Sequence, residues 1–84
     1  MTDFAPIMII LDQVINDRTV PKNIRAAAEA SKSVLSGSDS EKLKISTAVH
    51  SLEEVINDPN MPIYTRTQIW NIVSMLEQAS REIK

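Results

Sequence analysis

The chain has 84 residues, a length that supports one small hydrophobic core and is too short for two. Its composition is 43% hydrophobic and 24% charged, with a net charge of −2, which is typical of a folded domain and not of a disordered segment. So small a negative charge provides no field to attract nucleic acid or an anionic membrane. The absence of cysteine excludes disulfides, thiol catalysis and cysteine-bound metal within these residues.

Neither the apolar runs nor the first residues indicate a membrane or an export signal. The longest apolar run, residues 6–11, is far shorter than the roughly 20 residues of a membrane-spanning helix. No basic segment opens the chain, since the first cationic side chain is Arg18, whereas a secretory signal begins with one. We therefore expect a cytoplasmic protein.

The first half of the chain predicts two helices, over residues 4–17 and 21–36. Thr19 is the expected N-cap of the second helix, Pro21 suits its first turn, and Gly37 is its expected C-terminal cap. Both helices carry apolar or small residues at the i, i+3, i+4, i+7 spacing of a single buried face. These residues are Phe4, Ile7, Met8, Leu11, Val14 and Ile15, followed by Ile24, Ala27, Ala28, Ser31, Val34 and Leu35.

A serine-rich linker over residues 36–40 separates this half from two further predicted helices, over residues 41–57 and 62–83. Ser38 and Glu41 have capping-box spacing, and Asn60 is the expected cap of the last helix. The buried faces comprise Ile45, Ala48, Val49, Leu52, Val55 and Ile56, followed by Ile69, Ile72, Val73, Leu76, Ala79 and Ile83. Because alternation of period two is absent, we expect one all-α domain over residues 1–84, built from four helices in two antiparallel hairpins.

The two halves form an internal repeat with a period of 41 residues. Residues 11–35 align with residues 52–76 without a gap, and nine of the 25 pairs are identical, against one or two expected from a chance identity of roughly 6%. The repeat units span about residues 4–36 and 41–83. Two such units either stack as a HEAT-like pair or close into a short four-helix bundle, and the pattern does not distinguish these arrangements.

Several strings in the chain resemble known families. A helix ending at Asn16-Asp17, a short turn and the run Ile24-Arg25-Ala26-Ala27-Ala28 resemble a HEAT-type repeat. The strings over residues 17–25 and 57–74 resemble the archaeal uncharacterised protein family 0147 (UPF0147) across nearly the whole chain. This resemblance implies a small helical protein of an archaeal cytoplasm. It implies no activity and therefore no site residue.

No arrangement of residues predicts catalysis, a cofactor or a metal site. His50 is the sole histidine, and the Glu-x-x-His pattern of di-iron bundles does not occur. We expect His50 to be a solvated surface side chain, and the pair Glu53-Glu54 to be solvated charge and not an acid–base pair. A phosphate-binding glycine loop is impossible with one glycine. We expect a protein that is not an enzyme.

Two Asp–Arg pairs repeat at a spacing of eight residues, Asp17 with Arg25 and Asp58 with Arg66. One interpretation is a pair of anion sites, each combining an arginine with the amides of a helix N-terminus. The favoured interpretation is a structural clamp, in which the aspartate accepts from turn amides and the arginine bridges back to it. An aspartate beside the site would repel an anion.

Four residues are candidates for an interface. Ile9 and Ile10 lie off the buried face of the first helix, and their equivalents in the second repeat are polar, which predicts self-association through this helix. Tyr64 and Trp70 are aromatic residues among polar neighbours, as is common at interfaces. The leading hypothesis is a module that forms homo-oligomers or binds a protein partner. The alternative is a nucleic-acid-associated protein that uses Tyr64, Arg66 and Trp70 for stacking and charge.

Overall fold

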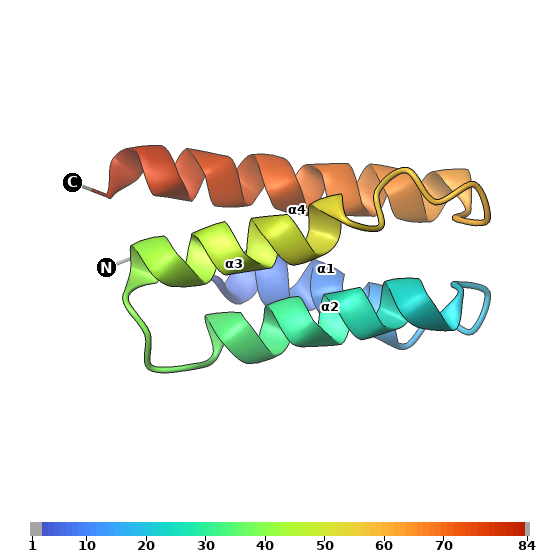
Figure 1. The fold of residues 1–84 in the computed structure, drawn as a ribbon, viewed down its shortest axis with the longest axis horizontal. Helices are drawn as coiled ribbons and strands as arrows, with labels where there is room; N and C mark the ends of the chain where they lie inside the picture. Colours follow the sequence, from blue (N-terminus) through green and yellow to red (C-terminus); the bar gives the residue numbers. More distant parts are fainter. Residues whose placement is uncertain (1–2, 84) are drawn as a thin grey trace.

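The chain folds as four α-helices: α1 (Ala5–Ile15), α2 (Lys22–Leu35), α3 (Glu41–Glu53) and α4 (Ile63–Glu82). A computed structural model describes residues 3–83 and contains no strand within them. Successive helices run in opposite directions, so that both short turns lie at one end of the molecule and the linker between α2 and α3 lies at the other (Figure 1). The predicted all-α class and its four helices are confirmed.

The four helices close into a bundle. Each helix contacts two others, in the order α1, α2, α3, α4 and back to α1, and among the described residues the diagonal pairs α1–α3 and α2–α4 do not pack together. A stack of two repeats would instead place equivalent helices against each other, α1 on α3 and α2 on α4. Of the two arrangements that the sequence left open, the structure therefore has the four-helix bundle.

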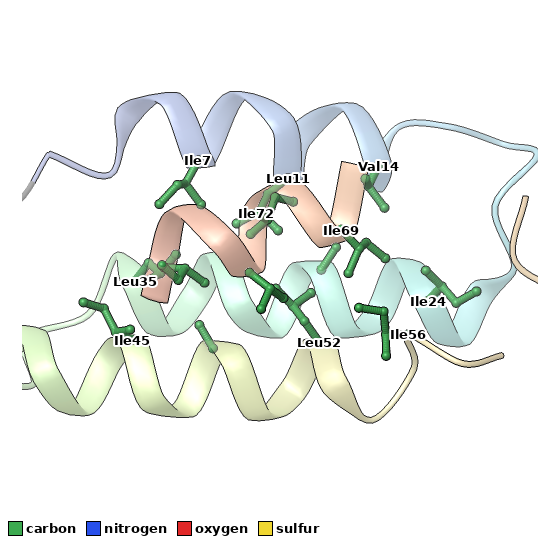
Figure 2. Close-up of a cluster of buried hydrophobic side chains, with 14 of the residues drawn as sticks. Ile7, Leu11, Val14, Ile24, Leu35, Ile45, Leu52, Ile56, Ile69 and Ile72 are labelled. Carbon is green, nitrogen blue, oxygen red and sulfur yellow. The ribbon is translucent and has the colours of Figure 1, made fainter. Parts of the chain in front are cut away.

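The apolar stripes of all four helices meet along the axis of the bundle. Figure 2 shows Ile7, Leu11 and Val14 of α1 directed towards the side chains of the other three helices. Leu11, Ile24, Leu52, Ile69 and Ile72 are completely buried, and burying a side chain of this size stabilises a fold by about 1.5–3 kcal/mol. The predicted stripes are thus the source of the core.

Both turns also contribute to the core. Val20 precedes α2 and Met61 precedes α4, and both are buried. They occupy equivalent positions in the two repeats, so the turns as well as the helices follow the period of 41 residues. The third helix is shorter than predicted, because it ends at Glu53 and the chain continues through i, i+3 turns such as Val55 N–H to Leu52 C=O at 3.2 Å.

The helix ends differ from the sequence-based expectations. Thr19 does not cap α2 and Asn60 does not cap α4, since these helices begin after Pro21 and Pro62 without a side-chain cap. The linker cap is Ser40 and not Ser38: its Oγ accepts from Leu43 N–H at 3.3 Å. Ser36 is the C-cap of α2, and Gly37, the expected cap, comes directly after it without the positive φ that glycine often adopts at a helix end.

The helices pack more extensively on one side of the bundle than on the other. The α2–α3 pair makes the most extensive contact of any two helices, and the α1–α4 pair makes the least. Small residues explain the close approach, because Ala28, Ser31 and Ala48 are all fully buried in this seam and Ser31 Oγ donates to Ala48 C=O at 3.3 Å. Their equivalents in the other half are the larger Ile69, Ile72 and Ile7, and the α1–α4 contact in that half is the least extensive of the four.

Candidate functional site

The turn between α1 and α2 is organised by Asp17. Its Oδ1 accepts from the backbone N–H of Thr19 at 2.9 Å and from the Thr19 hydroxyl at 2.7 Å. The hydroxyl bond, followed by the backbone bond, lowers the pKa of Asp17, because both bonds favour the ionised carboxylate. Asp17 therefore accepts from a turn amide, as the clamp interpretation expected.

Asp58 occupies the equivalent position before α4 and does more than organise its own turn. Its Oδ1 accepts from Asn60 N–H at 2.8 Å, and its Oδ2 accepts from Asn23 Nδ2 of α2 at 2.8 Å. The Asn23 bond is the main cause, and the Asn60 bond the next, of a lowered pKa at Asp58. This carboxylate thus connects the two turns at one end of the bundle.

The two arginines do not pair with these carboxylates in the predicted way. Arg66 Nη2 donates to the backbone carbonyl of Asp58 at 2.9 Å and not to its carboxylate, whose two oxygens accept from Asn23 and Asn60. In residues 3–83, Arg25 forms no ion pair, although its charge contributes to the lowered pKa of Asp17. The Nε atoms of both arginines are buried without a partner. The clamp therefore lacks its arginine–carboxylate bridge and keeps its aspartate-centred turns.

Large apolar side chains are exposed mainly on α4. Ile63 is 83% exposed, Tyr64 69% and Trp70 53%. Ile63 and Trp70 are seven residues apart and so lie within about 20° of each other on the outward face of α4. Tyr64 lies about 120° from Trp70 around the helix, on the flank towards α1 that also carries Gln68, which bonds to Gln13 of α1 at 3.1 Å. Tyr64 and Trp70 consequently do not form one surface.

The interface predicted on α1 is reduced to one residue. Ile9 is 60% exposed and faces away from the bundle, whereas Ile10 is half-buried and packs against the core. The polar residue opposite Ile10 in the repeat is Ser51, so the apolar choice at this position reflects packing of α1 within the bundle. Of the two α1 residues predicted to form an interface, Ile9 alone is exposed for contact with another molecule.

A groove runs between α3 and α4 and has a volume of about 430 Å³. Its floor is apolar and its rim carries charges of both signs. Eight residues line it: Lys42, Ile45, Ser46, Val49, His50, Glu53, Glu77 and Ser80. Such a volume lies within the range of about 300–1,000 Å³ that is usual for binding sites.

The described residues offer little for metal chemistry. Nowhere in residues 3–83 do three or more His, Cys, Asp or Glu side chains gather as a metal site would require. His50 is exposed, and its Nε2 lies 2.9 Å from Glu54 Oε1 one turn later on the same surface. None of the described helices has the length and apolar character needed to cross a membrane.

Comparison with known proteins identifies the family. The model of an uncharacterised protein family, UPF0147, matches residues 2–79. The chain belongs to this family. A UPF0147 protein of Methanocaldococcus jannaschii is 55% identical over 73 residues, which cover 86% of this chain and 78% of that protein. One from Archaeoglobus fulgidus is 43% identical over 72 residues, covering 86% and 83%.

Two solved structures have the same fold, and one of them is of a UPF0147 protein. A crystal structure of the Thermoplasma acidophilum member superposes with a TM-score of 0.87 at 42% identity and covers 92% of each chain. A second crystal structure, of a protein of unknown function, gives a TM-score of 0.80 at 42% identity and covers 92% of this chain and 96% of that one. The comparison therefore establishes a shared helical fold and identifies no activity.

Sequence reasoning missed three features of the molecule: the exposure of Ile63, the bond between Asn23 and Asp58, and the groove between α3 and α4. Ile63 is the most exposed large apolar residue, and the repeat alignment contains a signal for it, since Lys22 occupies the equivalent position. Asn23 was not recognised as the partner of Asp58, because its equivalent in the second repeat is Tyr64 and the bond has no counterpart there. The groove between α3 and α4 depends on side chains from helices in register, which spacing within one helix does not reveal.

Proposed function

We propose that this chain is a cytoplasmic, non-enzymatic interaction module that binds protein, either itself or a partner, through the outward face of α4. The observation that carries the proposal is the exposure of Ile63 and Trp70 on the same side of that helix, at 83% and 53%. Aromatic residues are enriched at interface centres, and a tryptophan is often the residue whose truncation costs most.

The surroundings of these two residues favour an interface over an unused surface. Trp70 and Ile63 are accompanied on the outward face by Thr67 and Ser74, which are short and polar and leave the larger side chains prominent. A single exposed apolar residue needs no explanation, but two aligned along one helix form a ridge.

The alternative of nucleic-acid binding has less support. Of its three residues, Arg66 is engaged with the Asp58 carbonyl and Tyr64 lies on a different flank of α4 from Trp70. Stacking on single strands requires aromatic and cationic groups along one surface. Binding to mixed RNA and DNA at low and high salt separates the alternatives, because contact with phosphates weakens steeply as salt rises.

Affinity purification from the cytoplasm of the source cells tests the proposal. The double variant Ile63→Ser/Trp70→Ser should lose every protein that the wild type retains. The matched control is Glu29→Ser/Ala30→Ser, which changes two exposed residues of α2, away from the outward face of α4, and should retain them. If the wild type neither self-associates nor retains any protein, the proposed function is wrong. Loss in both variants would also contradict it.

A further inference from the structure

This inference rests on the proposed function and specifies the binding partner, which is a second copy of the chain. We propose that the α3–α4 face is self-complementary, so that Trp70 of one copy enters the α3–α4 groove of a second copy while the second copy's Trp70 enters the groove of the first. This arrangement is a two-fold dimer, in which each subunit supplies one projecting side chain and one groove.

Trp70 and the groove lie on the same side of the molecule. Glu77 lines the groove and follows Trp70 by seven residues, so the two side chains leave α4 within about 20° of each other and about 10 Å apart along its axis. Trp70 therefore projects from the same side of α4 as the groove-lining Glu77, and one surface presents both parts. A second copy of the same surface can engage both at once.

The centre of this surface suits a two-fold axis. The groove is lined on α4 by Glu77 and Ser80, and Ser74 lies halfway between Trp70 and the middle of that segment. If two α4 helices pack antiparallel about Ser74, Trp70 of each lies level with the segment of the other that carries Glu77 and Ser80, which line the groove on α4. Ser74 is exposed, and its small side chain allows the two helices to approach closely at the crossing point.

The groove has the chemistry to hold an indole. Its floor includes Ile45, which is buried, and Val49, which is half-buried. The indole N–H is a hydrogen-bond donor only, and the walls supply acceptors in the hydroxyls of Ser46 and Ser80 and the carboxylates of Glu53 and Glu77. The ring thus finds apolar contact below and an acceptor at the rim. The volume of about 430 Å³ is ample for one side chain.

The area available is close to what a stable dimer needs. The Cα atoms span 37 × 19 × 19 Å, so one long side of the molecule presents on the order of 700 Å², and standard interfaces bury about 800 Å² on each partner. Because about 700 Å² is slightly less than that, a dimer through this side must use the whole of the α3–α4 face. The two inserted Trp70 side chains, one on each side of the point where the α4 helices cross, distribute the contact along that length.

Sedimentation and fluorescence of four chains test the proposal. The wild type should be a dimer at micromolar concentration. Trp70→Ala should raise the dimer dissociation constant at least about 100-fold, because each dimer loses two insertions, and Ser46→Tyr should do the same by filling the groove. Ile9→Lys is the control, since it changes an exposed apolar residue on α1, and it should leave the dimer intact. Circular dichroism verifies that all four fold.

Mixing the two defective variants provides the decisive measurement. Trp70→Ala retains its groove and Ser46→Tyr retains its tryptophan, so an equimolar mixture regains one of two insertions and should associate more strongly than either variant alone. Emission from the Trp70 of the Ser46→Tyr chain should then shift to shorter wavelength. No association in the mixture, or loss of the dimer only in Ile9→Lys, overturns the proposal. A monomeric wild type that retains a cellular protein through Ile63 and Trp70 overturns self-complementarity and leaves the proposed function standing.

Discussion

The side-chain amide of Asn23 donates a 2.8 Å hydrogen bond to Asp58 Oδ2, across 35 residues of sequence. Asn23 lies in the first turn of α2 and Asp58 lies before α4, so the bond joins the two hairpins at the end of the bundle where both turns lie (Figure 1). Within residues 3–83, the carboxylate of the other aspartate, Asp17, accepts hydrogen bonds from Thr19 alone, in its own turn. The two equivalent aspartates therefore have different roles. Asp17 stabilises its own turn, whereas Asp58 stabilises its own turn and also the contact between the two halves.

The first prediction is that stability falls in acid because of these two carboxylates. Hydrogen bonds lower the pKa of Asp17, chiefly from the Thr19 hydroxyl, and of Asp58, chiefly from Asn23. A pKa lowered by folding contributes stability above the unfolded-state value, and this contribution is lost as pH falls through the folded-state pKa. The melting temperature should decline below about pH 4.

Variants assign that decline to its source. Asp17→Asn/Asp58→Asn should flatten the acid limb of the melting curve, and Asn23→Ala should flatten it in part, since it removes the main donor to Asp58. Thermal unfolding followed by circular dichroism at a series of pH values measures the slope. An acid limb in the double variant as steep as that of the wild type contradicts the prediction.

The second prediction distinguishes the two arginines. Arg66→Ala should lower the free energy of unfolding by about 1–3 kcal/mol, because it removes a charge-assisted hydrogen bond to the Asp58 carbonyl. Arg25→Ala should cost less, since Arg25 makes no such bond in the described part of the chain. Urea denaturation of both variants measures the difference. Equal losses would show that the Arg66 bond contributes nothing beyond what Arg25 supplies through packing.

The third prediction concerns the neighbouring isoleucines of α1. Ile10→Ser should destabilise the fold by about 1–3 kcal/mol, because Ile10 packs against the core. Ile9→Ser should change stability by no more than about 0.5 kcal/mol, as is usual for an exposed position. The two variants make the same chemical change on adjacent residues, so each is the control for the other. A larger loss at Ile9 would contradict the observed orientation of α1.

The buried faces of the helices were predictable because an amphipathic helix can bury its apolar residues only by turning the face that carries them towards the core. Leu11, Leu52 and Leu76 are buried as their spacing indicated. The choice between a stack and a bundle was not predictable, since both arrangements bury the same stripes. The small residues Ala28 and Ser31 of α2 allow close contact with Ala48 of α3, and this contact favours the bundle. The spacing of residues along one helix does not show which other helix will pack against its small residues.

The turns were predicted less well because α2 and α4 begin directly after Pro21 and Pro62, two residues beyond the expected caps. Thr19 and Asn60 have good capping side chains, but Asp17 and Asp58 come two residues earlier and accept their backbone N–H groups. The repeat correctly marked Asp58 and Arg66 as neighbours. It did not reveal that Asn23 would occupy the carboxylate, because that contact lies between the repeats and not within one.

The fourth prediction tests the close α2–α3 seam. Ala48 is fully buried there, and its carbonyl accepts from Ser31 Oγ at 3.3 Å. Ala48→Ile adds three carbon atoms where the helices are in closest contact, and overpacking of this kind costs about 1–3 kcal/mol. The position equivalent to Ala48 in the first repeat is Ile7, so the same side chain is accommodated in the looser half of the bundle, where the α1–α4 contact is least extensive.

Ala30→Ile is the matched control for this change. Ala30 is exposed on α2, so its replacement carries only the helix-propensity difference between alanine and isoleucine, about 0.5 kcal/mol. Urea denaturation of both variants should give a larger loss for Ala48→Ile. The excess over Ala30→Ile measures the strain in the seam, because the two substitutions share the same intrinsic cost. If the two variants lose the same stability, α2 and α3 move apart without penalty, and small residues are not what makes this side of the bundle close.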